Sequence, residues 1–366
     1  MRVTMVISSL SSGGAERVMS TMANYWVEKG WEITFITLDT TSSDFYKLSD
    51  KIKRIALGVI TEEPTNIVKS ISTNLQRIMK VRTAIMRSKP DVVISFMDKT
   101  NVLVLLATKG VSIPIIVSER SDPRKQDVGK VYDRLRRWLY PSAKQVIVQT
   151  NSVKTWAEQF ISQEKVTTIP NPVSIINQGN KKAAESEKVL IALGRLSREK
   201  GYDLLLKAFA KCSQTFMDWT LNIVGEGPER KNLEQLAKDL GVEKRVRFIG
   251  RVHNPEQYLL ESDLFVMASR YEGFPNALLE AMACGLPAIS TNCLSGPSDI
   301  IDNGKSGILV ENENIDSLAD ALKELMGNKQ TRQMLAANAK EAVRKFDLDE
   351  VMKTWEKVVC KAAKKQ

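Results

Sequence analysis

The chain has 366 residues, of which 43% are hydrophobic and 26% are charged, and it carries a net charge of +10. This length and composition indicate a soluble globular protein of about two domains. The four cysteines lack C-x-x-C spacing and His253 is the one histidine. These counts argue against a disulfide framework, a histidine-based metal site and a Ser-His-Asp triad. No apolar run approaches about 18 residues, so no membrane-spanning helix is expected.

The positive charge is concentrated in the first half of the chain. Residues 1–180 carry 25 Lys and Arg against 16 Asp and Glu, whereas the remainder carries 28 against 27. Such asymmetry favours an anionic partner for the first half, which would be nucleic acid, anionic lipid or a phosphorylated substrate. The alternative is a solvated basic face without a partner.

The first half alternates short apolar runs with helical patterns, which is typical of a parallel sheet covered by helices. Gly13 and Gly14, between the first strand and helix, would let a phosphate or sugar approach the backbone, although the third glycine of the dinucleotide fingerprint is missing. Asp98 is expected in a loop after a strand. Strands are predicted at 3–10, 33–38, near 51–57, 91–96, 113–118, 145–150 and 165–170, and helices from about 15 onward, at 65–89, 101–109, 130–140 and 152–161.

After a linker rich in Asn, Lys, Ala and Ser, the same rhythm starts again. Two consecutive series predict an α/β protein with two doubly wound, Rossmann-like domains that face each other across a cleft. Strands are predicted at 188–194, 220–225, 245–250, 262–269 and 286–290, and helices at 202–212, 229–240, 255–261, 275–284, 315–326, 330–345 and 349–363. The predicted boundaries are 1–172 for the first domain, 173–186 for the linker, 187–345 for the second domain and 346–366 for a terminal helix that packs on the first domain.

The stretch Arg270–Pro287 predicts a loop and a helix at the carboxyl end of a buried strand, which is where ligands bind in open α/β sheets. Pro275 is expected at the first helical position. The N–H groups of Asn276, Ala277 and Leu278 would then point outward and form an anion site suited to phosphate.

Two acids flank this anion site. Glu272 lies in the loop beside it, next to Gly273, which permits close approach of a ligand to the backbone. Glu280, in the second helical turn, could accept hydrogen bonds from a ribose diol. The alternative is a capped helix with two solvated acids.

A second loop carries two cations to the same sheet edge. Gly194–Gly201 directly follows the first strand of the second half. Arg195 and Lys200 are therefore positioned to bind two phosphate groups as fixed cations. The alternative is that Arg195 and Lys200 are surface cations without a ligand. Because Glu272 is expected at the same sheet edge, we favour a binding role for them.

The helix predicted at 65–89 is amphipathic, and its polar face is basic. Such helices lie on anionic membrane surfaces, although packing of the apolar face on a sheet is the more common explanation. The helix at 130–140 combines Arg134, Arg136 and Arg137 with Trp138 and Tyr140, which also suits a lipid interface. The basic residues of the first helix are Lys69, Arg77, Lys80, Arg82, Arg87 and Lys89.

Together these motifs resemble glycosyltransferase family 4, whose members are retaining enzymes with two facing Rossmann-like domains, the GT-B fold. The first half looks most like bacterial transferases that extend polyprenyl-diphosphate-linked oligosaccharides with N-acetylgalactosamine. The family motifs are S-S-G-G-A-E-R at 11–17, I-P-N-P at 169–172, G-R-L-S-R-E-K-G at 194–201, G-E-G-P at 225–228 and E-G-F-P-N-A-L-L-E-A-M-A-C-G-L-P at 272–287, and the narrower likeness rests on F-Y-K-L at 45–48 and I-S-F-M-D-K-T-N at 94–101.

The resemblance implies a nucleotide-diphosphate-sugar donor, often a UDP-sugar, with Arg195 and Lys200 on the diphosphate and Glu280 on the ribose. Arg195, Lys200 and Glu272 would be the catalytic group. No cofactor or metal is implied, and the D-L-D at 347–349 is expected to cap the terminal helix. The donor contacts implied are Gly13, Gly14, Arg195, Lys200, Val252, Glu272, Gly273, Phe274, Pro275, Asn276, Ala277 and Glu280.

The acceptor side departs from the family in one place. Many relatives have a histidine where this chain has Arg120, so Arg120 could instead meet an anionic group such as a lipid diphosphate, with Arg77 as another candidate. The acceptor residues implied are Tyr46, Arg77, Asp98, Glu119 and Arg120.

The function expected from the resemblance is transfer of a hexose or N-acetylhexosamine, with N-acetylgalactosamine favoured, from a UDP-sugar to a lipid-linked oligosaccharide or surface-polysaccharide precursor. The enzyme would act in the cytoplasm as a peripheral protein on the inner face of the membrane, with an anionic membrane surface and no nucleic acid as partner. The alternatives are a UDP-sugar 2-epimerase of the same architecture and a catalytically silent glycosyltransferase-like subunit. The single histidine argues against the first, and the intact Arg195, Lys200, Glu272 and Glu280 argue against the second.

Overall fold

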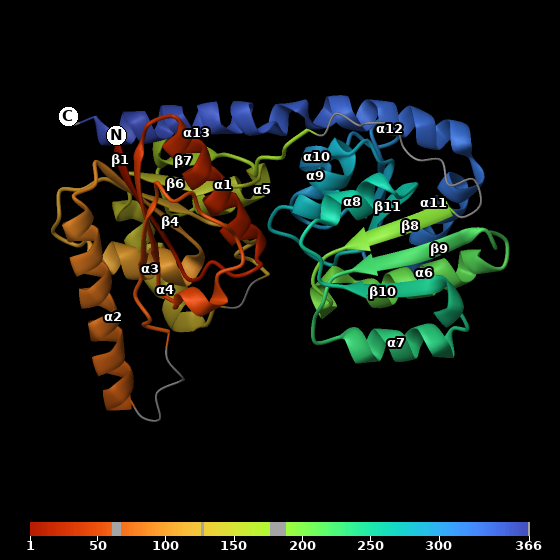
Figure 1. Ribbon diagram of the computed structural model, residues 1–366, viewed down its shortest axis with the longest axis horizontal. Helices are drawn as coiled ribbons and strands as arrows, with labels where there is room; N and C mark the ends of the chain where they lie inside the picture. Colours follow the sequence, from red (N-terminus) through yellow and green to blue (C-terminus); the bar gives the residue numbers. More distant parts are fainter. Residues whose placement is uncertain (61–66, 126–127, 176–187, 365–366) are drawn as a thin grey trace. The chain divides into compact units, whose positions relative to one another are not determined.

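The structure is a computed structural model that describes residues 1–60, 67–125, 128–175 and 188–364. It divides into two compact units (Figure 1). Unit 1 comprises Met1–Asn171 together with Val351–Gln366, and unit 2 comprises Pro172–Glu350. Most of the linker predicted at 173–186 lies outside the described residues.

Unit 1 is built on a seven-stranded sheet in the order β3-β2-β1-β4-β5-β6-β7, with every adjacent pair parallel. The order reverses between β1 and β4, so the loops after these two strands meet at a switch point. The strands are β1 (Arg2–Ile7), β2 (Glu32–Thr37), β3 (Lys53–Ala56), β4 (Val92–Phe96), β5 (Ile115–Ser118), β6 (Gln145–Val148) and β7 (Val166–Thr168).

Side chains of alternate strand residues face opposite sides of this sheet, and each side has its own cover of helices. Val93 of β4 belongs to the core beneath α2, α3, α4 and α5. Phe96 points to the other side, where its ring centroid lies 6.0 Å from that of Trp355 in α13. The helices are α1 (Gly14–Glu28), α2 (Ile67–Ser88), α3 (Asp98–Ala107), α4 (Lys130–Leu139), α5 (Asn151–Ala157) and α13 (Leu348–Ala363).

Unit 2 repeats this plan with a six-stranded parallel sheet in the order β10-β9-β8-β11-β12-β13. Here the order reverses between β8 and β11. The strands are β8 (Lys188–Leu193), β9 (Trp219–Val224), β10 (Val246–Gly250), β11 (Leu264–Met267), β12 (Ala288–Thr291) and β13 (Ile308–Val310), and the helices are α6 (Tyr202–Ser213), α7 (Arg230–Asp239), α8 (Pro255–Leu260), α9 (Asn276–Ala283), α10 (Pro297–Ile300), α11 (Ile315–Gly327) and α12 (Lys329–Val343).

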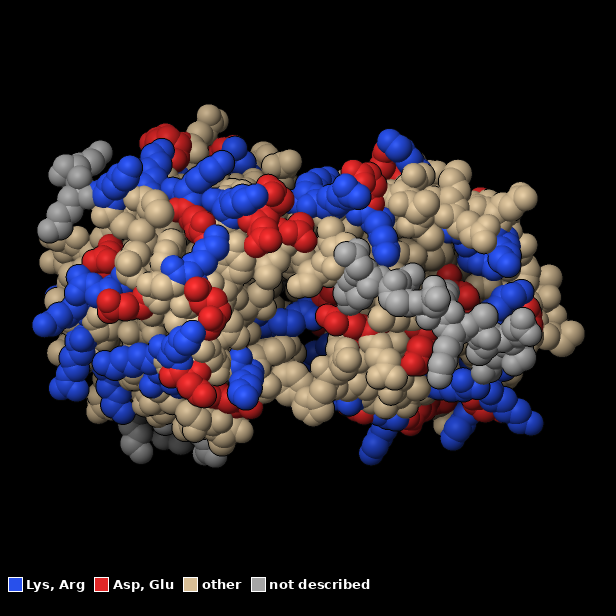
Figure 2. Space-filling view, turned by 45° about the horizontal axis from the view of Figure 1, so that its top comes forward, with Lys and Arg blue, Asp and Glu red and all other residues tan. Residues whose placement is uncertain are grey.

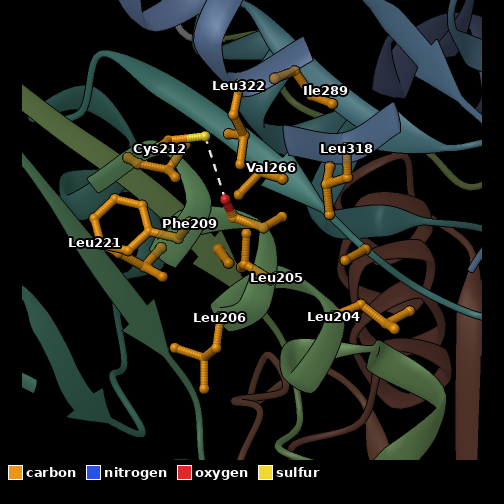
Figure 3. Close-up of a cluster of buried hydrophobic side chains, with 14 of the residues drawn as sticks. Leu204, Leu205, Leu206, Phe209, Cys212, Leu221, Val266, Ile289, Leu318 and Leu322 are labelled. Atoms are coloured by element: carbon orange, nitrogen blue, oxygen red, sulfur yellow. Dashed lines mark hydrogen bonds between the residues drawn. The ribbon is translucent and has the colours of Figure 1, made fainter. Parts of the chain in front are cut away.

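One face of the second sheet packs against α6, α7 and α11, and the other packs against α8, α9 and α12. Figure 3 shows the first of these cores, where Leu205 and Phe209 of α6 meet Leu318 and Leu322 of α11. Cys212 lies in the same core with Sγ 3.3 Å from the backbone oxygen of Ala319. Burial raises the pKa of this thiol to about 11, so it stays protonated and serves as an apolar packing group.

The α/β architecture with two doubly wound parallel sheets confirms the predicted fold class. One local prediction is wrong, because Asp98 is the first residue of α3 and does not lie in a loop. The short backbone turn at Met97, which has φ 78°, starts the helix three residues before the predicted position. In the part of the chain that the structure describes, no helix is both long enough and apolar enough to cross a bilayer.

Candidate active site

The candidate site in unit 2 lies at the switch point of its sheet, where the loops that follow β8 and β11 meet. Gly201 ends the first loop with φ 65°, and a Cβ there would lie 1.9 Å from the backbone oxygen of Ala268. Only glycine permits both the left-handed backbone and this approach. The two loops are therefore in backbone contact because residue 201 has no side chain.

Arg270 joins the same two loops. Its guanidinium donates to both carboxylate oxygens of Asp203, each at 2.8 Å, and to the backbone oxygen of Arg198 at 2.7 Å. Its backbone N–H donates to the oxygen of Glu199 at 2.8 Å. A paired fork of this kind fixes orientation as well as distance, so the loop from Arg195 to Lys200 is held in one place.

Lys200 and Glu272 form the ion pair at the centre of the site. Lys200 Nζ lies 2.8 Å from both oxygens of Glu272, and Ser269 Oγ donates to Glu272 Oε1 at 2.6 Å. The side chain of Glu272 is 7% exposed and that of Lys200 is 28% exposed. Lys200 runs back over Gly194, since a Cβ at that residue would lie 3.9 Å from Lys200 Cε.

Arg195 differs from Lys200 in its surroundings. Its side chain is exposed, and among the described residues no hydrogen bond or ion pair engages its guanidinium. The backbone around it is fixed, because Gly194 and Leu196 donate to the oxygens of Val224 and Glu226 at 3.0 and 2.9 Å. Arg195 is therefore a cation on a rigid base whose donors remain available to a ligand.

The start of α9 corrects one prediction. The helix begins at Asn276, and Pro275 is the N-cap residue, one position earlier than expected. The N–H of Asn276 donates to the oxygen of Phe274 at 3.0 Å, so it is not directed outward. Within the described chain, the N–H groups of Ala277 and Leu278 donate no hydrogen bond. These two amides remain available at the helix N-terminus.

The other donor residues surround this helix start. Phe274 is buried, with its ring centroid 5.8 Å from that of Phe346, so only its backbone can meet a ligand. Gly273 has its oxygen bound by Ser295 Oγ at 3.3 Å. Glu280 lies in the second turn of α9 and is half-buried, and Val252 follows β10 and packs against the core that contains α9.

Three participants of this site were not recognised in the sequence, namely Ser269, Arg270 and Asp203. A signal for the first two was present, because both lie within three positions of Glu272, after a buried strand. Asp203 gave no signal, since its partner Arg270 is 67 positions away.

The candidate site in unit 1 begins at the loop between β1 and α1. Gly13 is the N-cap of α1, and its extended backbone carries no side chain that would cover the helix start. The carboxylate of Glu16 lies over this glycine, since a Cβ at Gly13 would be 2.1 Å from Glu16 Oε2. Ser9 and Ser11 donate to Glu16 Oε1 at 3.3 and 3.4 Å. Burial raises the pKa of Glu16.

A buried polar cluster occupies the carboxyl ends of β4 and β5. Tyr140 Oη donates to Glu119 Oε2 at 2.8 Å, and Asn101 Nδ2 lies 3.0 Å from Tyr140 Oη. Glu119 is 1% exposed, and burial raises its pKa to about 7. Within the described residues, Glu119 Oε1, Asn101 Oδ1 and Asp98 Oδ2 are buried and have no hydrogen-bond partner.

Arg120 is more enclosed than a ligand-binding cation would be. It is 8% exposed, its guanidinium carbon lies 4.2 Å from the Phe96 ring centroid, and Nη2 donates to Asn171 Oδ1. Burial lowers its pKa to about 9. Nε is buried and has no partner among the described residues, so one donor is left for an acceptor group.

The last two acceptor candidates are Arg77 and Tyr46. Arg77 of α2 donates from Nε to the backbone oxygen of Val59 at 2.9 Å and is half-buried. Tyr46 follows the turn after β2 and packs edge-on against Phe45, with ring centroids 5.1 Å apart. The structure does not bring these two residues into the cluster around Glu119.

Residues 12–175 match the family model described as Glycosyltransferase Family 4, and residues 174–342 match the model described as Glycosyl transferases group 1. The chain belongs to glycosyltransferase family 4. It is therefore a glycosyltransferase, as the motifs at 194–201 and 272–287 had indicated.

A curated relative and two solved structures extend this finding. The chain is 29% identical over 361 residues to an α-1,4-N-acetyl-D-galactosaminyltransferase of Campylobacter jejuni, whose name gives a GalNAc-GalNAc-diNAcBac-PP-undecaprenol substrate; the match covers 98% of each chain. Anabaena HepE in complex with UDP-glucose superimposes with a TM-score of 0.81 at 19% identity, covering 99% of this chain and 100% of the other. Sucrose-phosphate synthase of Thermosynechococcus elongatus gives 0.85 at 18% identity, covering 99% of each. These neighbours confirm the GT-B fold.

Proposed function

We propose that this glycosyltransferase is a retaining, metal-independent enzyme that moves N-acetylgalactosamine from UDP-N-acetylgalactosamine to a polyprenyl-diphosphate-linked glycan. The observation that carries the proposal is the geometry at the switch point of unit 2. There the exposed Arg195 belongs to the loop that carries Lys200, and the amides at the start of α9 follow Glu272 in the chain, so the Lys200–Glu272 pair joins the two segments. The relative's named substrate supports the choice of acceptor and sugar.

Each residue of this site has a distinct part in the proposed reaction. As the sugar leaves, negative charge grows on the diphosphate, and Arg195, Lys200 and the amides of Ala277 and Leu278 stabilise it. Glu272 holds Lys200 in place from its buried position and faces the sugar. Glu280 accepts hydrogen bonds from the ribose hydroxyls.

Retention of configuration requires that the acceptor arrive on the face from which the diphosphate leaves. In our proposal an oxygen of the donor's own phosphate takes the proton from the acceptor hydroxyl, so no protein nucleophile is required. The charge that a divalent metal would supply comes from Arg195 and Lys200 in this scheme.

The acceptor lipid suggests that the enzyme works on the surface of a membrane, and unit 1 has a suitable face. Leu75, Met79 and Met86 on α2 are exposed to 59, 54 and 45%, opposite to the residues that pack on the sheet. The cations beside them divide into two groups. Lys80, Arg87 and Lys89 are exposed, whereas Arg77 and Arg82 bind backbone oxygens of Val59, Ala107 and Lys109.

The test is a screen of purified protein against UDP-N-acetylgalactosamine, UDP-N-acetylglucosamine, UDP-galactose and UDP-glucose. Each donor is combined with a polyprenyl-diphosphate-linked disaccharide, with and without EDTA, and the product is followed by mass spectrometry and NMR of the new linkage. We expect an α-linked N-acetylgalactosamine product whose rate EDTA leaves unchanged. A β linkage, or dependence on metal, contradicts the mechanism. Conversion of a UDP-sugar to its 2-epimer without acceptor identifies an epimerase, and no turnover of any donor identifies a silent subunit.

A further inference from the structure

Unit 1 contains a cavity that the proposed reaction has not used. It has a volume of about 620 Å³ and lies between the loop that leaves β5, helix α4 and helix α5. This volume is within the range of small-molecule sites, roughly 300–1,000 Å³. Among the described residues the lining is strongly basic, with Arg124, Lys130, Arg134, Arg136 and Arg137 beside one acid, Asp133.

Most of the negative charge near this cavity is already neutralised. Asp133 accepts from Arg136 Nη2 at 2.6 Å and from Arg137 Nε at 3.1 Å. Arg124 is paired with Asp122, which is 3% exposed. Lys130 and Arg134 are exposed and have no ion pair or hydrogen bond within the described part of the chain. The cavity thus retains positive charge that its own acids do not offset.

Arg136 provides an independent indication that the cavity is built for an anion. Its side chain is 3% exposed; Nη2 donates to Asp133, and Nη1 lies 3.7 Å from Glu119 Oε2. Nε is buried and has no hydrogen-bond partner among the described residues. Buried donors without partners are costly in the absence of a ligand. The guanidinium lies 4.7 Å from the Trp156 ring centroid, which keeps its plane fixed. A planar, fixed arginine suits the oxygens of a phosphate.

The face of α4 that borders the cavity is amphiphilic. Val131 and Trp138 are exposed to 70 and 61%, and Arg134 lies between them at helical spacing, on the same side. Lys109 Nζ sits 4.8 Å from the Trp138 ring centroid. An anion bound by Arg134 would therefore have exposed apolar surface on both sides, which suits a phosphate that is attached to a hydrocarbon chain.

We propose that this cavity binds the diphosphate of an isoprenoid diphosphate, which in the proposed function is the lipid end of the acceptor. Lys130 and Arg134, together with Nε of Arg136, bind the phosphoryl oxygens, and the hydrocarbon chain lies over Val131 and Trp138. The identity of the ligand rests on the proposed function, whereas the binding site consists of residues of unit 1 alone. Arg77 and Arg120 each bind an oxygen within the protein, whereas Lys130 and Arg134 of the cavity have no ion pair or hydrogen bond within the described chain, so we favour the cavity as the diphosphate site.

The cavity also has a route to the rest of unit 1. Arg136 Nη1 lies 3.7 Å from Glu119 Oε2, and Glu119 accepts from Tyr140 in the cluster at the ends of β4 and β5. A diphosphate held by Arg136 would thus lie close to the residues proposed to meet the acceptor sugar. This arrangement would bring the lipid-proximal end of the glycan towards the carboxyl edge of the sheet.

The test measures binding without any sugar donor, so that it does not depend on transfer. Farnesyl diphosphate, inorganic diphosphate and farnesol are titrated calorimetrically into the full-length protein and into the double variant K130Q/R134Q. The matched control K53Q/K144Q removes two exposed cations of unit 1 that lie outside the cavity. UDP binding and the unfolding temperature are recorded for all three proteins to show that each is folded.

We expect the wild type to bind farnesyl diphosphate and to bind farnesol at least tenfold more weakly. The affinity for farnesyl diphosphate should fall at least tenfold in K130Q/R134Q and less than twofold in the control. Equal affinity of K130Q/R134Q and the wild type for farnesyl diphosphate overturns the proposal. Equal affinity of the wild type for inorganic diphosphate and farnesyl diphosphate overturns the isoprenoid source. Retention on phosphatidylglycerol vesicles is measured as well. If K130Q/R134Q loses vesicle binding as strongly as it loses farnesyl diphosphate binding, the ligand is bulk phospholipid, and the isoprenoid proposal is overturned. If the site binds as expected but no UDP-sugar is turned over, the proposed function fails while the cavity assignment stands.

Discussion

Lys200 binds both carboxylate oxygens of Glu272, with Nζ 2.8 Å from each, and this pair links the two loops that meet at the switch point of unit 2. The pair has a consequence for the donor site, because most of the charge of Lys200 is already balanced by a carboxylate that is 7% exposed. Arg195 has no such partner among the described residues. The two cations therefore differ in what their removal should do.

Replacing Arg195 by alanine should impair transfer without loss of stability. Its guanidinium is exposed, and it stabilises charge on the leaving diphosphate in the proposed reaction. Loss of one such donor typically lowers kcat by about 10²–10³. Steady-state kinetics and thermal unfolding check this. Arg198→Ala removes a neighbouring exposed arginine of the same loop and is the control. A kcat for Arg195→Ala within twofold of the control would remove Arg195 from the mechanism.

Replacing Lys200 by methionine should reduce both activity and stability. Glu272 would remain buried with only Ser269 as a donor, and leaving a buried acceptor under-satisfied costs about 1–3 kcal/mol. The double variant Lys200→Met/Glu272→Gln removes the unpaired charge and should recover most of the stability but none of the activity. Urea unfolding of the four proteins of this cycle measures the coupling. A Lys200→Met protein as stable as the wild type would show that the pair is formed only weakly in solution.

The contact at Gly201 can be tested with a matched pair of glycines. Gly201 and Gly241 have nearly the same backbone, with φ 65° and 66°, but only Gly201 has an atom close to the position of a new Cβ. Alanine at Gly241 should cost about 1–2 kcal/mol from the left-handed backbone alone. Alanine at Gly201 should cost at least about 2 kcal/mol more, because the Ala268 carbonyl must move. Equal costs in urea unfolding would mean that the two loops do not touch.

The basic face of α2 should contribute to retention on anionic vesicles. Replacing Lys80, Arg87 and Lys89 by glutamine removes three exposed cations, each worth about 1 kcal/mol near an anionic surface. We expect sedimentation with phosphatidylglycerol vesicles to fall by more than tenfold in affinity. The control is glutamine at Lys53, Lys144 and Lys361, which are exposed elsewhere in unit 1. Equal loss in both variants would indicate attraction by net charge without a docking face.

The choice of cations for the vesicle test matters because Lys and Arg side chains on the face shown in Figure 2 are interspersed with Asp and Glu. The sequence pattern at 65–89 does not distinguish between exposed cations and cations that bind within the protein. In the structure, Arg82 Nη1 donates to the oxygen of Ala107 at 2.8 Å. Its removal would loosen the contact between α2 and α3 as well as change the charge, so it is unsuitable for a test of membrane binding.

The sequence predicted the parts of the fold and the site that depend on local patterns. Alternating βα units gave both sheets, and Arg195, Lys200 and Glu272 were recognised because each follows a buried strand. The pairing of Lys200 with Glu272 was not predicted, since 72 positions separate them and no local rule sets which cation meets which acid. The N–H of Asn276 was misjudged for a different reason, because a tight turn at Pro275 redirects it.

The cluster around Glu119 was least accessible from the sequence. Ser118, Glu119 and Arg120 appear there as polar residues at a strand end, of which Glu119 and Arg120 were expected to meet the acceptor. In the structure Glu119 is 1% exposed, because Tyr140 and Arg136 of the α4 region cover it. Burial of this kind depends on which helix packs against which strand, and only the tertiary structure specifies it.

Glu119 should make the stability of the protein depend on pH in a way that a single substitution removes. Burial raises its pKa from 4.5 to about 7 in the folded chain, so the folded state binds a proton that the unfolded state has released. Its stabilising contribution is complete below about pH 4.5 and is lost as the pH rises through about 7.

Glutamine at this position cannot ionise and can still accept the hydrogen bond from Tyr140. We expect Glu119→Gln to gain stability relative to the wild type as the pH is raised from 5 to 8, as measured by urea unfolding at each pH. Glu32→Gln is the control, because it removes an exposed acid of the same unit outside the cluster. A difference between wild type and Glu119→Gln that does not change from pH 5 to 8 would show that Glu119 is ionised throughout this range, with Arg136 as its counterion.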